Sequence, residues 1–419
     1  MFIFKRIEPK TTFTFKPGVY YLPMSTAGLK FRAYADEATV RAIRARLDAA
    51  CALYNTLRSA DHQAYKERGR GLGRYELKSL ALKLRREHEE YNVLYSMVAD
   101  EVADRFYRAR GRFFKGVARF PRPKKPEKYH SITYRRNGWK IISARLVRGG
   151  KKRMVRLRLS NLGELDVLVH RDFPMDRVRR VTVKIDRAGR IFVIFVVDGF
   201  NPYHLLPRTG REAGLDVGIE KLIVTSDGYY VPNPRLHERE LIHLDRLREE
   251  FFHKKRGSKR WEKARLRLAR AEARIADTRR DMYMKVGKAL ATHYDLVVME
   301  DINIRRMAGR SRRVLRWRLH DASFHELRSI IEYQMKKYGK EFALVDPNGT
   351  SKTCARCGFV NERLTLNNRV FVCPVCYWVD DRDHNAALNI LKKSGREPPV
   401  VPAELHPLPL PLGAEWWSR

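Results

Sequence analysis

Cys354-Ala355-Arg356-Cys357 and Cys373-Pro374-Val375-Cys376 are two closely spaced cysteine pairs with fifteen residues between them. Four thiolates in two such pairs provide the tetrahedral set of soft ligands that zinc prefers, and the length between the pairs is typical of a zinc ribbon. Gly358 and Pro374 place each pair in a turn, so that both sulfurs of a pair can face one ion. Because four thiolates leave no open coordination position, we predict one structural zinc ion bound by Cys354, Cys357, Cys373 and Cys376.

The alternative for these four cysteines is a pair of disulfides. The chain has only five cysteines in 419 residues, whereas disulfide scaffolds are short and rich in cysteine. The fifth, Cys51, lies in an apolar helical segment and is interpreted as a small core residue. We therefore favour zinc.

The chain is strongly basic. It contains 86 lysines and arginines against 48 aspartates and glutamates, which gives a formal net charge of +38 and an isoelectric point near 10.3. Basic residues are interleaved with aromatic ones, as in Arg105-Phe106-Tyr107-Arg108, rather than confined to a tail. This distribution predicts folded surfaces that follow phosphate backbones, with aromatic rings available to stack on bases.

A membrane surface is the rival partner for so basic a chain. No apolar run approaches the ~20 residues of a spanning helix, and no lipidation motif is present. The longest apolar stretch, Ile191 to Val197, has the length of a buried strand. We therefore expect no membrane partner and a cytoplasmic, nucleoid-associated protein.

In the N-terminal half of the sequence, the spacing of apolar residues changes twice. Residues 1–35 hold short β-prone pieces, and residues 36–118 have helical spacing, with Leu94, Val98 and Val102 four residues apart. A proline- and lysine-rich stretch ends the helical region, and strand alternation returns over residues 119–205. We expect a small β-barrel there, which the N-terminal strands would help to complete.

The C-terminal half predicts a separate α/β domain over residues 206–350, with a helical insertion at about 236–290. The zinc ribbon follows at 351–379 and a final helix at 380–395. Residues 396–419 are rich in proline and leucine without a usable period, and are predicted to form a flexible tail.

Three acidic residues stand where this domain could bring them together. Asp216 lies in the first strand, Glu300 ends a later strand, and Asp383 begins the final helix, within Asp380-Asp381-Arg382-Asp383-His384-Asn385-Ala386-Ala387. Carboxylates on adjacent strands and a neighbouring helix form the acidic cluster of RNase H-like nucleases. Two Mg²⁺ ions bound by such a cluster could support hydrolysis of a phosphodiester.

Each acid alone has a simpler interpretation. Asp216 could be a turn carboxylate, Glu300 a surface residue at a strand end, and Asp383 the N-cap of the last helix. Asp381 also competes with Asp383 on spacing. The order of strand aspartate, strand glutamate, cysteine pairs and the final acidic run makes a coincidence improbable.

The sequence resembles the TnpB family of transposon-encoded, RNA-guided DNA endonucleases, relatives of the type V CRISPR effectors. The resemblance is close over about residues 212–393 and is carried by Gly214-Leu215-Asp216-Val217-Gly218, Val298-Met299-Glu300-Asp301-Ile302-Asn303, Thr350-Ser351-Lys352-Thr353 with the first cysteine pair, and Asp381 to Ile390. It is looser in the N-terminal half, at Tyr54-Asn55 and Phe113-Phe114.

The resemblance implies a multidomain α+β protein. Its parts would be a helical recognition lobe at 36–118, a β-barrel wedge domain at 119–205 that grips a guide RNA, and a RuvC-type nuclease domain with an inserted zinc ribbon. The catalytic, Mg²⁺-binding residues would be Asp216, Glu300 and Asp383. The family motif places the ligand two residues before Asn385, which favours Asp383 over Asp381.

The function expected on these grounds is RNA-guided cleavage of double-stranded DNA next to a short flanking motif, by a monomeric ribonucleoprotein. A guide RNA would recognise the DNA sequence by base pairing. This explains why so basic a sequence has no helix-turn-helix, homeodomain or finger array. The alternatives are a compact type V CRISPR effector of the same ancestry, an RNA-guided DNA-binding regulator without cleavage, and a guide-free nuclease or transposase.

Overall fold

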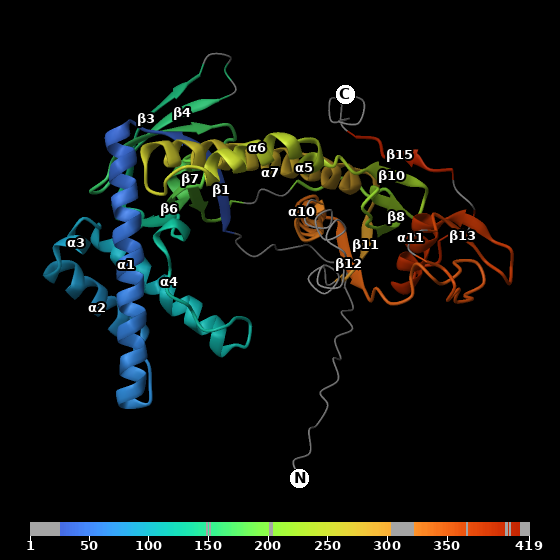
Figure 1. Ribbon diagram of the computed structural model, residues 1–419, viewed down its shortest axis with the longest axis horizontal. Helices are drawn as coiled ribbons and strands as arrows, with labels where there is room; N and C mark the ends of the chain where they lie inside the picture. Colours follow the sequence, from blue (N-terminus) through green and yellow to red (C-terminus); the bar gives the residue numbers. More distant parts are fainter. Residues whose placement is uncertain are drawn as a thin grey trace, which may run out of the picture. The chain divides into compact units, whose positions relative to one another are not determined.

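The computed structural model describes residues 26–147, 150, 152–200, 204–302, 322–365, 368–398, 401 and 404–410. The predicted strands before residue 26 and the end of the predicted tail therefore lie outside the described residues. The chain divides into two compact units (Figure 1). The first contains residues up to 184 together with 191–201, and the second contains residues 185–190 and 202–419.

The first unit contains a group of helices: α1 (Glu37–Arg68), α2 (Arg74–Glu87), α3 (Glu89–Asn92) and α4 (Ser96–Phe114). The long helix α1 begins at Asp36, whose side chain accepts a hydrogen bond from the backbone N–H of Thr39. It ends at Gly69, which adopts the left-handed conformation that only glycine reaches without strain. The predicted four-residue spacing holds, because Leu94, Val98, Val102 and Phe106 are all buried.

The first unit also contains a seven-stranded sheet in the order β2-β6-β7-β1-β5-β4-β3. β1 lies in the middle, antiparallel to β7 and β5. Within the described residues the strand order is open, with β2 and β3 at the edges, so the sheet forms a half-barrel, and β1 completes it from the N-terminal side as the sequence predicted. The 3-10 turn η2 (Arg136–Gly138) connects β2 to β3 along the chain, but these two edge strands are not paired with each other in the sheet. The strands are β1 (Ala27–Tyr34), β2 (Ser131–Arg135), β3 (Trp139–Leu146), β4 (Arg153–Leu159), β5 (Gly163–Val169), β6 (Val178–Ile185) and β7 (Ile191–Val197).

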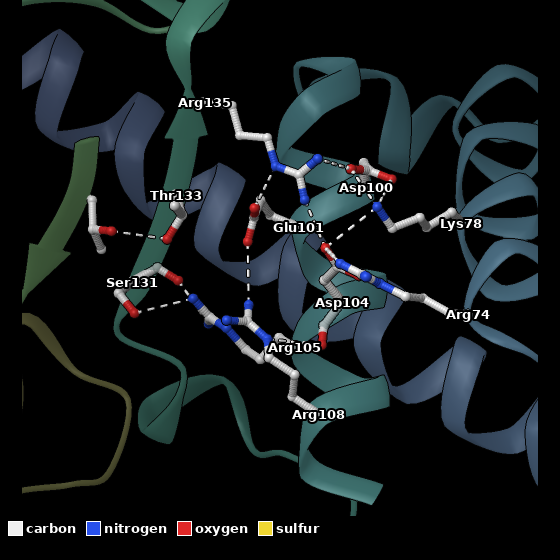
Figure 2. A network of polar contacts seen from close by, with 11 residues as sticks. Arg74, Lys78, Asp100, Glu101, Asp104, Arg105, Arg108, Ser131, Thr133 and Arg135 are labelled. Carbon is white, nitrogen blue, oxygen red and sulfur yellow. Dashed lines mark hydrogen bonds and ion pairs between the residues drawn. The ribbon is translucent and has the colours of Figure 1, made fainter. Parts of the chain in front are cut away.

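A polar network joins α4 to α2 and to the edge strand β2 (Figure 2). Asp104 of α4 accepts hydrogen bonds from Arg74 of α2 at 2.8 Å and from Arg135 of β2 at 2.6 Å. Arg135 also bonds Glu101 and pairs with Asp100. Burial alone would raise the pKa of Asp104, but hydrogen bonds and charges from Arg74 and Lys78 outweigh it and lower the pKa to about 2.

The second unit is built on a six-stranded mixed sheet in the order β12-β11-β8-β9-β10-β15. β8, β11 and β12 run parallel, whereas β9 is antiparallel to both β8 and β10. The strands are β8 (Glu212–Asp216), β9 (Lys221–Thr225), β10 (Tyr229–Pro232), β11 (Leu296–Glu300), β12 (Glu341–Val345) and β15 (His406–Pro407). A separate two-stranded sheet pairs β13 (Val370–Val372) with β14 (Val379–Asp381).

The helices of the second unit are α5 (Leu236–Arg239), α6 (Leu241–Phe252), α7 (Lys259–His293), α10 (Phe324–Lys337) and α11 (Arg382–Lys393). The break between α6 and α7 falls at Gly257-Ser258, as predicted, and the Ser258 side chain caps α7. The C-terminal part of α7 packs with α10 on a core of buried side chains that includes Val286, Leu290 and Ile331. None of the described helices is both long and apolar enough to span a membrane.

The prediction of a flexible tail from residue 396 is wrong for residues 406–410. β15 adds to the edge of the sheet beside β10, with hydrogen bonds from the N–H groups of His406 and Leu408 to the carbonyls of Gly228 and Tyr230. Leu408 is buried in the core and Leu410 packs against it. Proline is tolerated in such a strand because an edge strand needs donors on one side only.

Asp104→Asn is expected to destabilise α4 by about 2 kcal/mol near neutral pH, because the carboxylate is buried and its pKa is lowered. The folded pKa lies below the unfolded value, so this stability is complete above about pH 4 and is lost as the pH falls towards 2. Native-state hydrogen exchange of the α4 amides measures the difference between variant and wild type.

The control is Asp166→Asn, because the pair of Asp166 with Arg156 lies on the surface and should contribute less than about 1 kcal/mol. A difference at Asp104 that stayed constant from pH 6 down to about pH 2 would contradict the ion-pair explanation.

Candidate functional site

Asp216 and Glu300 lie at the same edge of the mixed sheet. β8 and β11 are parallel, with Leu215 paired to Met299, and each acid is the last residue of its strand. The carboxyl ends of adjacent parallel strands share one edge of a sheet, so the backbone alone makes the two residues neighbours. Both side chains are half-buried.

Helix α11 brings Asp383 to this edge. The helix packs on β8 at Gly214, where an added Cβ would overlap the carbonyl oxygen of Ala387 and lie 2.8 Å from the backbone nitrogen of Leu391. A Cβ at Gly218, just beyond β8, would lie 3.9 Å from Oδ2 of Asp383. The two glycines thus permit a close approach that places Asp383, which is buried, beside the end of β8.

The electrostatics connect Asp216 to the other two acids. Removal of water from its carboxylate, and then the negative charges of Asp383 and Glu300, raise the pKa of Asp216 well above its ordinary value. Burial also raises the pKa of Glu300, although a hydrogen bond from Thr350 and the charge of Lys393 oppose the effect. Three carboxylates held together in this way favour binding of a cation.

The three acids do not form a compact cluster of ligand atoms like that of the four cysteines. Among the described residues, only the four cysteines form a group of three or more acidic, histidine or cysteine side chains whose ligand atoms all lie within 4.8 Å of one another. The three acids therefore line one edge of the sheet rather than meeting at a point.

The structure separates the roles of Asp381 and Asp383. Asp381 is the N-cap of α11, since its Oδ1 accepts hydrogen bonds from the backbone N–H groups of Asp383 at 2.9 Å and His384 at 3.2 Å. Its Oδ2 pairs with Lys221 at 2.6 Å. Asp381 therefore caps α11, a role that the sequence analysis had allowed for Asp383. Asp383 does not cap the helix and lies at the acidic edge.

Several positioning residues carried no signal in the sequence analysis. His384 is fully buried, with Nδ1 2.6 Å from Oδ2 of Asp380 and Nε2 3.2 Å from the carbonyl oxygen of Ser226. Thr350 donates a hydrogen bond to Glu300. The contacts of His384 with Ser226 and of Thr350 with Glu300 join residues 158 and 50 positions apart, so only the fold could reveal them.

The four cysteines lie close enough to bind one metal ion. The sulfurs of Cys354 and Cys376 are 3.6 Å apart, and those of Cys357 and Cys373 are 3.5 Å apart. Burial opposes ionisation of Cys373, but hydrogen bonds from the backbone N–H groups of Cys376 and Val375 outweigh it and lower the pKa of the thiol to about 7.

The same helix that carries Asp383 also anchors the cysteine module, residues 350–381. Asn385 donates to the carbonyl of Thr353 at 2.8 Å and accepts a hydrogen bond from the N–H of Ala355 at 2.9 Å. Asn389 donates to the carbonyls of Thr350 and Thr353 at 2.9 and 2.6 Å. Both asparagines are buried, so their amides hold the first cysteine knuckle in a fixed position on α11.

Two family models match the second unit and the end of the first. The model described as "Probable transposase" matches residues 196–311, and the model described as "Cas12f1-like, TNB domain" matches residues 324–390. The first range contains Asp216 and Glu300, and the second contains Asp383 and all four paired cysteines.

Two relatives resemble the chain over part of its length. A Streptomyces pristinaespiralis protein named "Putative RNA-guided DNA endonuclease" is 38% identical over 213 residues, which are 50% of this chain and 52% of that protein. The "TnpB-like protein MJ0751" of Methanocaldococcus jannaschii is 32% identical over 183 residues, which are 41% of this chain and 64% of that protein. The chain thus spans about half to two thirds of the length of these relatives.

The fold as a whole resembles a solved structure. The structure of the mini-RNA-guided endonuclease CRISPR-Cas_phi3 superposes with a TM-score of 0.51 and 10% sequence identity, over 90% of this chain and 94% of that one. At this identity the likeness concerns the fold alone.

Proposed function

We propose that this chain is an RNA-guided DNA endonuclease. The premise is that it belongs to the TnpB family, as the matches over residues 196–311 and 324–390 and the similarity to TnpB-like proteins indicate. Its substrate is double-stranded DNA beside a short flanking motif, and its guide is an RNA held by the protein. The observation that carries the proposal is the arrangement of Asp216, Glu300 and Asp383 at one edge of a mixed sheet, next to a four-cysteine cluster.

The acidic edge fits two Mg²⁺ ions held by Asp216, Glu300 and Asp383. The fit rests on the position of the three carboxylates at one edge of the sheet. Burial, and then the negative charges of Asp383 and Glu300, raise the pKa of Asp216, and bound cations would favour its ionised form. Oxygen ligands of this kind suit Mg²⁺. When bound, the metal pair supplies the charge stabilisation and the activated water that hydrolysis of a phosphodiester requires.

The chain's own residues keep this site in shape. The cap at Asp381 fixes the first turn of α11 and so the position of Asp383. Thr350 orients the carboxylate of Glu300, and Arg382, 3.2 Å from Asp383, places a positive charge beside the cluster. That charge favours the ionised form of Asp216 and would attract a DNA phosphate.

The cysteine cluster fits one structural zinc ion. Four sulfurs at ~2.3 Å from a central ion would be separated by about 3.8 Å, close to the observed separations of 3.6 and 3.5 Å. We assign Cys354, Cys357, Cys373 and Cys376 as its ligands. The resulting zinc ribbon, with the two-stranded sheet of β13 and β14, would form one side of the entry for DNA.

The remaining parts take their roles from the same proposal. Residues 36–118 form the recognition lobe and residues 119–205 the wedge domain that grips the guide RNA. Residues 206–350 and 380–395 form the RuvC-type, RNase H-like nuclease domain around the ribbon at 351–379. The strand order, with β8 and β11 parallel and β9 antiparallel, supports this assignment.

Asp216→Ala, Glu300→Ala and Asp383→Ala are each expected to abolish DNA cleavage while preserving RNA binding, because each carboxylate would hold the metal ions rather than the fold. Asp381→Ala should lose a helix cap worth about 1 kcal/mol and keep cleavage within roughly tenfold of wild type. Cleavage of a matched plasmid by the purified ribonucleoprotein in Mg²⁺ measures both effects. A normal rate for Asp383→Ala beside an inactive Asp381→Ala would show that the assignment of these two residues is reversed.

Elemental analysis of the purified protein should find about one zinc per chain. Cys373→Ser should remove that zinc and unfold residues 353–381 locally, because metal binding contributes on the order of 10 kcal/mol to folding of such modules. Hydrogen exchange should increase there and not in β8 or β11. Cys51→Ser is the matched control and should retain zinc, since Cys51 is buried in α1, donates to the carbonyl of Lys124 and is not one of the four clustered cysteines. Folded, active protein without zinc would contradict the assignment.

Guided cleavage is tested with the RNA that copurifies with the protein. We expect one dominant RNA species that survives a high-salt wash, with a structured part and a variable 3′ end. Replacing the 3′ end should redirect double-strand cleavage to the newly matched DNA when the flanking motif is kept. Binding without cutting would favour a regulator, and equal cutting without RNA would favour a guide-free nuclease.

A further inference from the structure

The first unit contains a basic hollow of about 890 Å³. It is lined by five arginines, Arg74, Arg135, Arg177, Arg179 and Arg180, and by Asp176 and Asp198. The arginines come from the start of α2, the edge strand β2, and the turn η3 (Met175–Arg177) with the beginning of β6. The volume is sufficient for a nucleotide-sized group.

Two of these arginines are held in place by acids of α4. Figure 2 shows Arg74 and Arg135 converging on Asp104, with Arg135 also bound to Glu101 and Asp100. A guanidinium has five N–H donors, so these ion pairs fix the orientation of Arg74 and Arg135 without using every donor. The acids of α4 neutralise the positive charges of Arg74 and Arg135. They do not neutralise the charges of the other three arginines that line the hollow.

Arg180 lies directly opposite Arg135 in the register of β2 and β6. Opposite residues of an antiparallel pair project from the same face, and two like charges there repel each other. Within the described residues, Arg180 and Arg177 form no ion pair, while Arg179 is 3.5 Å from Asp198. Arg177, Arg179 and Arg180 thus face only two lining carboxylates, which leaves a local excess of positive charge.

An anion with one negative charge and several acceptor oxygens would neutralise this excess positive charge and accept hydrogen bonds from the arginines. A phosphodiester has these properties, and the planar fork of a guanidinium matches its oxygens. A contact of this kind recognises the backbone and fixes its position, independently of base sequence.

We propose that this hollow binds phosphodiester groups of a nucleic-acid backbone, with Arg177, Arg179 and Arg180 as the contacting residues and Arg74 and Arg135 as a pre-oriented wall. The proposal rests on the proposed function, because it names a contact of the nucleic acids that the protein handles. It concerns binding alone and does not depend on cleavage.

The test uses the full chain with the triple substitution Arg177→Gln, Arg179→Gln and Arg180→Gln. The matched control replaces Lys66, Arg68 and Arg70 with glutamine, which removes the same charge from exposed residues at the end of α1. Fluorescence anisotropy measures binding of a labelled RNA hairpin and, in a separate arm, a DNA duplex of equal length, over a series of salt concentrations.

The hollow triple should weaken binding about tenfold or more and lower the slope of log affinity against log salt by about 1 to 2. The control should change affinity less than about threefold, because it removes the same charge but leaves the lining of the hollow intact. The arm with the larger loss identifies whether RNA or DNA supplies the phosphate, and equal losses indicate that both do. If the hollow triple loses no more affinity than the control in either arm, the proposal is wrong.

Neutral methylphosphonate linkages give a sharper form of the same test. At one or two backbone positions, a neutral linkage should weaken binding of the wild type but not further weaken binding of the hollow triple. If the triple folds poorly, as judged by thermal melting, Arg180→Gln alone carries the test, with a slope change of about 1, and Arg180→Lys should restore part of the affinity. Unchanged slopes for Arg180→Gln would refute the proposal even if guided cleavage were established.

Discussion

Gly214 lets helix α11 lie directly against strand β8, and the candidate site depends on this contact. With a side chain at this position, Cβ would overlap the carbonyl oxygen of Ala387, and the helix would have to move outward. The start of α11 carries Asp383, whereas the end of β8 carries Asp216. The distance between these two carboxylates is therefore set by how closely the two backbones pack.

Helix α11 also connects the acidic edge to the cysteine module. One side of its first turn is fixed by the cap at Asp381, which Lys221 in turn holds, and by buried His384 between Asp380 and Ser226. Another side binds the first cysteine knuckle through Asn385 and Asn389. A disturbance of the four-cysteine cluster can thus reach Thr350 and the Glu300 carboxylate through a short series of hydrogen bonds.

The sequence was most informative where chemistry or period is local. The cysteine spacing predicted the cluster, and the longest apolar run predicted β7 at Ile191–Val197 with its observed bounds. It was least informative where tertiary contacts decide the outcome. The open edges of the seven-stranded sheet, the edge strand β15 built from a proline-rich segment, and the pairing of Thr350 with Glu300 depend on partners far away in the chain. Spacing alone could not distinguish Asp381 from Asp383, because only the helix start defines which one caps it.

The central claim is that Asp216, Glu300 and Asp383 form one metal site at the edge of the mixed sheet. The most direct measurement is a crystal structure of the protein with Mn²⁺ in place of Mg²⁺, with the ions located by their anomalous scattering. We expect anomalous peaks in contact with carboxylate oxygens of Asp216 and Asp383, with Glu300 binding one of the ions. Ions bound by Asp381 or Asp380 instead, or an acidic edge that stays free of metal at saturating Mn²⁺, would contradict it.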